Sequence, residues 1–180
     1  VGSDSAIRLR LPETERDSTI TFEDLIVGAY PQNLCSEVGD FIIRRRDRLF
    51  SYQLAVAVDD QFQHISHIIR GSDLLDSTPR QLYLQGCLGA SAEQTAAMQY
   101  GHLPLAVNGE GQKLSKQNHA PALIPGEESS NLWLALEWLQ QAPPVELRSE
   151  NSATILSWAI SNWSLAKIPN CAEIPAPNSV

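Results

Sequence analysis

Long apolar runs are absent from this chain of 180 residues, although 43% of its residues are hydrophobic. Stretches such as residues 54–58 fall far short of the roughly 20 apolar residues that a membrane-spanning helix requires. The hydrophobic fraction is nevertheless too high for a wholly disordered chain, and the length is enough to bury a sizeable core. These features exclude a transmembrane helical protein and predict a globular one with no membrane partner.

An excess of basic residues is also absent, because 13 Lys and Arg face 21 Asp and Glu, for a formal net charge of −8. Both halves of the chain share this acidic balance, which argues against a broad basic surface for nucleic acid. The exception is a short cluster in which Arg44, Arg45, Arg46 and Arg48 crowd together. We interpret this cluster either as a contact to RNA phosphates or as a solvated hairpin.

Cysteine is scarce, and the three that occur, Cys35, Cys87 and Cys171, lie far apart with no CxxC pair. An odd and sparse set favours reduced thiols in the cytoplasm over a disulfide framework. We expect each of these cysteines to be a small buried hydrophobic residue.

Metal-ligand patterns are equally sparse. His64 and His67 resemble a ligand pair, but no third ligand follows at metal-binding spacing. Asp59 and Asp60 fall in a predicted strand, where neighbouring side chains point to opposite faces, so we interpret them as a strand-end turn. We therefore expect no metal site in this chain.

Apolar periodicity predicts a mixture of strands and helices. Strands are expected at residues 6–11, 19–22, 40–45, 50–58, 65–69 and 103–107. Residues 23–38 are expected to form a loop, and residues 46–48 and 108–111 to form tight turns. The near-continuous apolar runs favour strands buried on both faces, as in the parallel sheets of α/β proteins.

Helical patterns occur in the middle and in the last third of the chain. Residues 77–79 have the form of a helix start, with a hydroxyl cap and a proline in the first turn. Large apolar residues at helical spacing predict helices over residues 131–141 and 150–163, ahead of a proline-rich tail at 169–177. All four tryptophans lie on these last two helices, and we expect them to serve helix packing.

The most informative segment for chemistry is the string GQKLSKQN at residues 111–118. A glycine-containing turn is followed by Lys113 and Lys116, which flank a serine. Lysines on such a loop hold nucleotide phosphates and neutralise the charge that develops during transfer. The loop lacks the GxxxxGK[ST] pattern of a Walker A motif, and on its own it is also consistent with two solvated lysines.

The surrounding motifs add a family resemblance. The string KLSK at 113–116 follows HLPL at 102–105, and YQLAVAVDD at 52–60 precedes IIRGSDLLDSTPRQ at 68–81. In this order, over residues 40–123, they resemble the glutamyl/glutaminyl branch of the class I aminoacyl-tRNA synthetases. The resemblance implies an α/β fold, namely the second half of a Rossmann-like catalytic domain followed by C-terminal helices. It predicts a partial synthetase core with a KMSK-type loop in residues 1–123, and a helical segment with a proline-rich tail in residues 124–180.

A finer resemblance lies in the loop itself. Residues 113–123 read KLSKQNHAPAL, with Gln117 where a glutamyl-tRNA synthetase normally has arginine. This loop, and the few residues that follow the two helices, resemble the glutamyl-Q tRNA(Asp) synthetases, a shortened branch of the family. The resemblance implies a cytoplasmic, monomeric ligase that activates L-glutamate with ATP, with Mg²⁺ expected, and transfers it to the queuosine base in the anticodon of tRNA(Asp).

The resemblance also assigns roles to individual residues. Arg70 matches an arginine that binds the glutamate substrate, and a guanidinium fork suits a carboxylate. Tyr52 matches a tyrosine that hydrogen-bonds the same amino acid. Lys116 and Lys113 are the expected catalytic residues, which stabilise the charge that builds toward pyrophosphate. The ATP-binding loop is expected to comprise Lys113, Leu114, Ser115, Lys116 and Gln117.

The residues alone leave other interpretations open for two of these positions. Arg70 is also consistent with a surface ion pair to Asp73 or Asp76, and Tyr52 with a half-buried aromatic residue on a strand.

Two features of the family have no counterpart in this sequence. None of the four histidines forms a HIGH-type motif, and the cysteine cluster that binds zinc in the family is absent. We expect the chain to be part of a longer enzyme, and the isolated 180 residues to form no glutamyl-adenylate. Two alternatives stay open: a non-catalytic module that binds tRNA or a protein partner, and part of a glutamyl-tRNA synthetase, against which Gln117 weighs.

Overall fold

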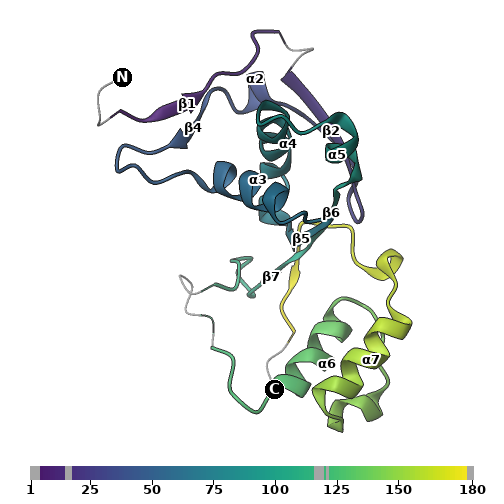
Figure 1. The fold of residues 1–180 in the computed structure, drawn as a ribbon. Helices are drawn as coiled ribbons and strands as arrows, with labels where there is room; N and C mark the ends of the chain where they lie inside the picture. Colours follow the sequence, from purple (N-terminus) through teal and green to yellow (C-terminus); the bar gives the residue numbers. More distant parts are fainter. Residues whose placement is uncertain (1–4, 15–17, 116–119, 121, 178–180) are drawn as a thin grey trace. The chain divides into compact units, whose positions relative to one another are not determined.

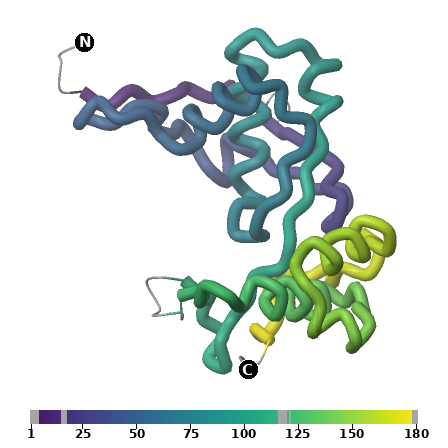
Figure 2. The backbone as a smooth tube through the Cα atoms, turned by 60° about the horizontal axis from the view of Figure 1, so that its bottom comes forward, coloured from purple at the N-terminus to yellow at the C-terminus, as the bar shows by residue number. Residues whose placement is uncertain are grey.

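The computed structural model describes residues 5–14, 18–115, 120 and 122–177. Its backbone divides into two compact units, Val1–His102 and Leu103–Val180, which Figures 1 and 2 show from two directions. The sequence placed the end of the catalytic core at residue 123. The boundary at residue 123 stays a prediction, because it was derived from family motifs, whereas the two units are defined by backbone contacts.

The first unit contains a four-stranded sheet with the order β3-β2-β6-β5. β2 (Thr19–Asp24) runs antiparallel to β3 (Gly28–Asn33) and parallel to β6 (Gln99–Leu103). The fourth strand is β5 (His67–Gly71). The predicted α/β class is therefore confirmed in its coarse form, with a mixed sheet and not a purely parallel one.

The loop predicted over residues 23–38 is wrong, because this segment contains β3 and the short helix α2 (Leu34–Glu37). Pro31 and Gly28 favoured a loop in the sequence. A proline is tolerated here because β3 lies at the edge of the sheet, where its missing N–H interrupts no ladder on the outer side. Gly28 adopts a φ of 83° at the hairpin turn, a conformation that glycine reaches without steric cost.

The strand predicted over residues 50–58 is also wrong, because helix α3 (Tyr52–Phe62) occupies this stretch. Ser51 caps the helix, and its hydroxyl accepts a hydrogen bond from the Leu54 amide at 3.4 Å. A short apolar run does not distinguish a buried strand from a helix, and here the cap and the packing of α3 against α4 decide. Asp59 and Asp60 consequently lie in the last turn of a helix, which corrects their interpretation as a strand-end turn.

Helix α4 (Ser77–Cys87) begins where the sequence predicted it. The predicted hydroxyl cap is wrong, because Asp76 precedes the helix and its side chain makes no capping hydrogen bond. The first turn is instead buried, with Thr78 fully inaccessible and Ser77 only 4% exposed. Both hydroxyls are used in contacts with other elements of the unit.

The core of the first unit forms between α4 and the sheet. Phe22 of β2, Leu82 of α4 and Tyr100 of β6 are buried together. The rings of Phe22 and Tyr100 meet edge to face with centroids 5.5 Å apart, a favoured aromatic geometry. This cluster fixes α4 across β2 and β6, and thereby holds the start of α4 near the ends of these strands.

The first unit also contains a small antiparallel pair of strands, β1 (Ile7–Leu9) and β4 (Phe41–Arg44). The tight turn predicted at residues 46–48 is confirmed, with the Arg48 amide donating to the Arg45 carbonyl at 3.1 Å. The described part of this unit also contains the 3₁₀ turn η1 (Ser72–Leu74) and helix α5 (Ala92–Ala97).

The second unit combines a two-stranded parallel sheet with two helices that lie side by side (Figures 1 and 2). The strands are β7 (Leu105–Val107) and β8 (Glu173–Pro175), so the predicted proline-rich tail includes a strand. The strand predicted over 103–107 is interrupted at Pro104, between β6 and β7. The helices are α6 (Glu128–Trp138) and α7 (Ser152–Asn162), with the 3₁₀ turns η3 (Val145–Ser149) and η4 (Leu165–Lys167).

Two of the four tryptophans, Trp133 and Trp158, pack between α6 and α7 as predicted, whereas Trp163 follows the end of α7 and is 42% exposed. Trp133, Leu136 and Ile155 form the buried core of this unit, and Trp158 packs against it. The Trp133 indole N–H donates to the Pro144 carbonyl at 3.0 Å, so the polar end of the ring is also satisfied.

The exposure of the cysteines differs from the prediction. All three cysteines are unpaired but exposed, so the prediction that each is buried is wrong. Within the residues that the structure describes, no helix combines the length and apolarity needed to cross a membrane.

Candidate functional site

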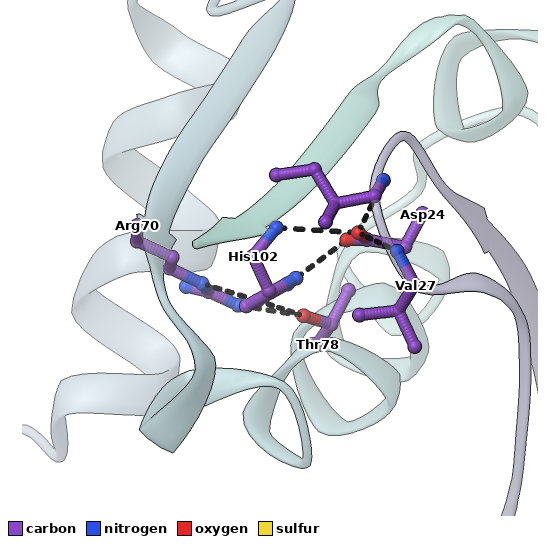
Figure 3. A network of polar contacts seen from close by, with 6 residues as sticks. Asp24, Val27, Arg70, Thr78 and His102 are labelled. Carbon is purple, nitrogen blue, oxygen red and sulfur yellow. Dashed lines mark hydrogen bonds and ion pairs between the residues drawn. The ribbon is translucent and has the colours of Figure 1, made fainter. Parts of the chain in front are cut away.

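Four polar residues from four elements meet at the strand ends of the first unit (Figure 3). Asp24 is the last residue of β2, His102 is next to last in β6, and Arg70 is next to last in β5. Thr78 lies in the first turn of α4. Because β2 and β6 run parallel, their carboxyl ends lie at the same edge of the sheet, which is where ligand sites of α/β proteins form.

Asp24 anchors this network from inside the protein. Its Oδ1 accepts hydrogen bonds from three backbone amides, those of Ile26 at 2.9 Å, Val27 at 3.0 Å and His102 at 3.2 Å. Its Oδ2 accepts from the His102 ring nitrogen Nδ1 at 2.6 Å, and both side chains are inaccessible to solvent. Burial by itself would raise the pKa of Asp24, but the hydrogen bonds from His102, Val27 and Ile26 outweigh it and lower the pKa below the ordinary value. Asp24 is therefore a buried carboxylate in its charged form.

The partners of His102 determine its protonation state. A carboxylate accepts hydrogen bonds only, so Nδ1 carries a proton and donates it toward Asp24. Arg70 Nε, at 3.0 Å from His102 Nε2, is a donor only, so Nε2 must present its lone pair. His102 is therefore a neutral imidazole with its proton on Nδ1.

The Arg70 guanidinium lies at the open end of the network. Its Nε donates to His102 Nε2 at 3.0 Å and its Nη2 donates to Thr78 Oγ1 at 2.7 Å. Thr78 Oγ1 also lies 3.3 Å from His102 Nε2, so the two acceptors stand side by side. Arg70 as a residue is partly exposed to solvent. Asp76, one of the two carboxylates considered as a surface partner for Arg70, pairs with Arg80 at 3.2 Å.

Tyr52 is the first residue of α3 and is 49% exposed, so the alternative of a strand aromatic is wrong. The next residue, Gln53, links the first turns of α3 and α4. Its Nε2 donates to Ser77 Oγ at 3.0 Å, and its Oε1 accepts from Gln81 Nε2 at 2.9 Å. These bonds fix the helix start that carries Tyr52, and its role toward glutamate stays a prediction.

The beginning of the KLSK loop belongs to the second unit and follows a tight turn. Asn108 closes the turn, with Oδ1 accepting from the Gln112 amide at 2.8 Å, and Gly111 adopts a φ of 75°. Lys113 then pairs with Val107 in an antiparallel bridge, and the Leu114 amide donates to the Ala106 carbonyl at 2.8 Å. The loop therefore starts on a strand-like segment beside β7.

The predicted loop residues are only partly covered by the structure. Lys113 is exposed, Leu114 is 39% exposed and Ser115 is half-buried. Lys116 and Gln117 lie outside the described residues. The ATP-binding and catalytic roles of this loop stay predictions.

Two further expectations concern metal and RNA. Within the described ranges, no three His, Cys, Asp or Glu side chains cluster closely enough to hold a metal ion. The arginine turn at residues 45–48 is exposed, and Arg45 pairs with Asp47 at 2.7 Å. Both interpretations of this turn, RNA contact or solvated hairpin, stay open.

Sequence reasoning missed two members of the network, Asp24 and Thr78, and recognised His102 only as part of the HLPL string. The signal for Asp24 was its position two residues after the predicted strand 19–22 and four residues before Gly28. The signal for Thr78 was its place in the predicted helix start. Neither signal identifies a contact partner. Asp24 and His102 are 78 positions apart in the chain, and Arg70 and His102 are 32 apart.

The comparisons with known proteins identify the family of the chain. The family model for the catalytic domain of class I tRNA synthetases (E and Q) matches residues 2–124. The chain therefore belongs to this family of class I synthetases.

Within the family, the chain is a homologue of glutamyl-Q tRNA(Asp) synthetases. It is 46% identical to the Pseudomonas aeruginosa protein of that name over 172 residues, which cover 96% of this chain and 56% of the relative. It is 44% identical to the Neisseria meningitidis protein, covering 97% of this chain and 55% of that one. The chain thus spans about half the length of these curated relatives.

The fold is shared with solved structures of the same family. The glutamate-tRNA synthetase of Elizabethkingia anophelis superposes with a TM-score of 0.65 at 23% identity, covering 95% of this chain and 37% of that one. At this identity the likeness concerns the fold alone.

Proposed function

We propose that this chain supplies the second catalytic half of an enzyme that activates glutamate with ATP and transfers it to the queuosine base of tRNA(Asp). The observation that carries the proposal is the 46% identity to a glutamyl-Q tRNA(Asp) synthetase over 96% of the chain. The network at the strand ends supports it, because buried residues hold the guanidinium of a partly exposed arginine, Arg70. We also propose that the enzyme is monomeric and cytoplasmic. Cysteines that form no disulfide are typical of the reducing cytoplasm.

In the proposed reaction, Arg70 binds a carboxylate of glutamate and Tyr52 hydrogen-bonds the same molecule. A glutamate carboxylate oxygen attacks the α-phosphorus of ATP, and the bond to the pyrophosphate oxygen breaks with its electron pair leaving on pyrophosphate. Lys113 and Lys116 stabilise the negative charge that grows on the leaving group. The backbone and side chains of Leu114, Ser115 and Gln117 form the rest of the ATP loop.

Magnesium is expected to accompany ATP. The described residues supply no cluster of three acidic, histidine or cysteine side chains for it, so the phosphates and water would be its main ligands. No step of the proposed reaction is assigned to a metal ligand of this chain.

The test is a chimera in which this chain replaces the segment that it matches in the Pseudomonas aeruginosa relative. Transfer of labelled glutamate is measured with queuosine-modified tRNA(Asp), unmodified tRNA(Asp) and tRNA(Glu). The proposal predicts transfer to the modified tRNA(Asp) alone. Charging of tRNA(Glu) would instead identify a glutamyl-tRNA synthetase segment, and binding of tRNA without any transfer would identify a non-catalytic module.

The loop assignment has its own prediction. In the chimera, Lys116→Ala should lower kcat for glutamate-dependent ATP–pyrophosphate exchange by about 100-fold, because one cation on the developing charge is lost. Lys167→Ala, an exposed lysine on η4, is the matched control and should leave exchange unchanged. Equal rates for Lys116→Ala and wild type would remove this loop from the mechanism.

A further inference from the structure

We infer that Asp24 and His102 are positioning residues, which hold the Arg70 guanidinium with one fork open toward a substrate carboxylate. This inference rests on the proposed function, in which Arg70 binds glutamate. It assigns a task to two buried residues that the reaction itself does not touch.

The Arg70 guanidinium uses one edge to bind the protein and leaves its end fork without a protein partner among the described residues. An arginine side chain presents five N–H groups in a planar arrangement. Nε and Nη2 lie along one edge, and both donate to protein acceptors, His102 Nε2 and Thr78 Oγ1. The two N–H groups of Nη1 and the second N–H of Nη2 make no hydrogen bond to the described residues. One N–H of Nη1 and the second of Nη2 run parallel at the end of the side chain, which is the fork that matches two carboxylate oxygens.

The acceptor of the Arg70 Nε–H, the His102 ring, is held rigidly. The His102 ring is inaccessible to solvent, and residue 102 is bound twice to one carboxylate. Its backbone amide donates to Asp24 Oδ1, and its ring nitrogen Nδ1 donates to Asp24 Oδ2. The ring therefore cannot rotate without breaking a charge-assisted bond inside the protein, and its Nε2 stays aimed at Arg70 (Figure 3).

His102 must be neutral to accept a hydrogen bond from the Arg70 guanidinium. A protonated imidazole would turn an N–H toward the guanidinium and place two cations in contact. Asp24 holds the proton on Nδ1 and so keeps Nε2 as the acceptor, in the way that carboxylates orient histidines in other sites. Asp24 thus fixes the His102 ring, and the His102 ring in turn fixes the Arg70 guanidinium.

A direct test follows the Arg70 Nε–H by NMR in the 180-residue chain without substrate. In the wild type, this proton should exchange slowly with water, and long-range nitrogen spectra should show His102 protonated on Nδ1 only. His102→Leu removes the acceptor and should accelerate Nε–H exchange at least about tenfold. His102→Gln offers an amide oxygen in place of Nε2 and should restore most of the protection. His67→Leu, an exposed histidine on β5, is the matched control.

The consequence for the substrate is measured in the chimera by pyrophosphate exchange. His102→Leu should raise the KM for glutamate about tenfold with kcat within about twofold, because a misplaced Arg70 weakens binding in the ground state and the transition state alike. Thr78→Val, which removes the other acceptor with little change of shape, should act in the same direction. His102→Gln should return KM toward the wild-type value.

The outcomes separate the two proposals. Equal protection of the Arg70 Nε–H in wild type and His102→Leu, or an unchanged KM in both acceptor variants, overturns the positioning role. A wild-type chimera that fails to exchange pyrophosphate with glutamate counts against the proposed function instead. In that event the Nε–H measurement alone decides whether Asp24 and His102 position Arg70.

Discussion

The Asp24 carboxylate uses both of its oxygens, and this distinguishes it from any neutral residue of the same shape. Oδ1 accepts three backbone amides and Oδ2 accepts the His102 ring. An asparagine offers one acceptor oxygen and one NH₂ group, so one of these two sets of donors would face another donor. The hydrogen bonds in the folded state therefore stabilise the charged form of Asp24. The free energy of unfolding of the first unit consequently depends on that charge.

We expect Asp24→Asn to destabilise the first unit by about 2 kcal/mol at pH 7, as is typical for hydrogen bonds to a charged group. The pKa of Asp24 is lowered in the folded state from its ordinary value of 3.8, so its contribution is present above pH 3.8 and is lost as the pH falls through the lower folded value. Urea unfolding of both proteins from pH 7 to pH 3 measures this. The difference between them should be constant down to about pH 5 and shrink below pH 4, and a difference that grows on acidification would contradict the assignment.

At the scale of elements, the pairing of α6 with α7 shows how one buried position stabilises two helices. Ile155 on α7 is fully buried against Trp133 and Leu136 of α6, whereas Ile160 on the same helix is 81% exposed. Both are isoleucines on one helix, so a comparison between them isolates burial from helix propensity. All four tryptophans lie between residues 133 and 163, so tryptophan fluorescence reports on this unit.

Ile155→Ala should lower the free energy of unfolding of the second unit by about 3 kcal/mol, through lost apolar burial and the cavity left behind. The matched change Ile160→Ala should stay within about 0.5 kcal/mol of wild type. Denaturant unfolding followed by tryptophan fluorescence measures both. Similar losses for the two variants would mean that the packing between α6 and α7 is not what holds the unit together.

The elements also show where sequence patterns are sufficient. α6 and α7 are long and periodic, and they were predicted close to their observed ends. The apolar run at residues 50–58 predicts a strand, but the structure has helix α3 there. A short apolar stretch fits both patterns, and only its packing partner distinguishes them. Pro31 argues against a strand and so predicts a loop where the structure has β3. The position of β3 at the edge of the sheet is what makes the proline tolerable.

At the scale of the whole molecule, the chain carries the glutamate-binding candidates and the KLSK loop but no HIGH-type motif. It spans about half the length of the relatives that it matches, with 56% coverage of the Pseudomonas aeruginosa protein. A nucleotide site needs groups on several sides to stabilise the charge that develops during transfer, and one loop supplies only part of them. Activity of the isolated chain is therefore a separate question from activity of the chimera.

We expect the isolated chain of 180 residues to show no glutamate-dependent ATP–pyrophosphate exchange above background. The chimera with the Pseudomonas aeruginosa relative, assayed side by side, should exchange at a rate comparable to that relative. Robust exchange by the isolated chain would mean that these residues form a complete activation site by themselves.

The sequence by itself determined the family, the two C-terminal helices, the start of α4 and the identity of Arg70 as a candidate, because each depends on a local pattern or a motif of ordered spacing. Only the tertiary structure decided what holds Arg70. Asp24, Thr78 and His102 are brought to it by the parallel pairing of β2 with β6 and by the packing of α4. Such long-range contacts arise from how whole elements pack, and no local pattern in the chain encodes them.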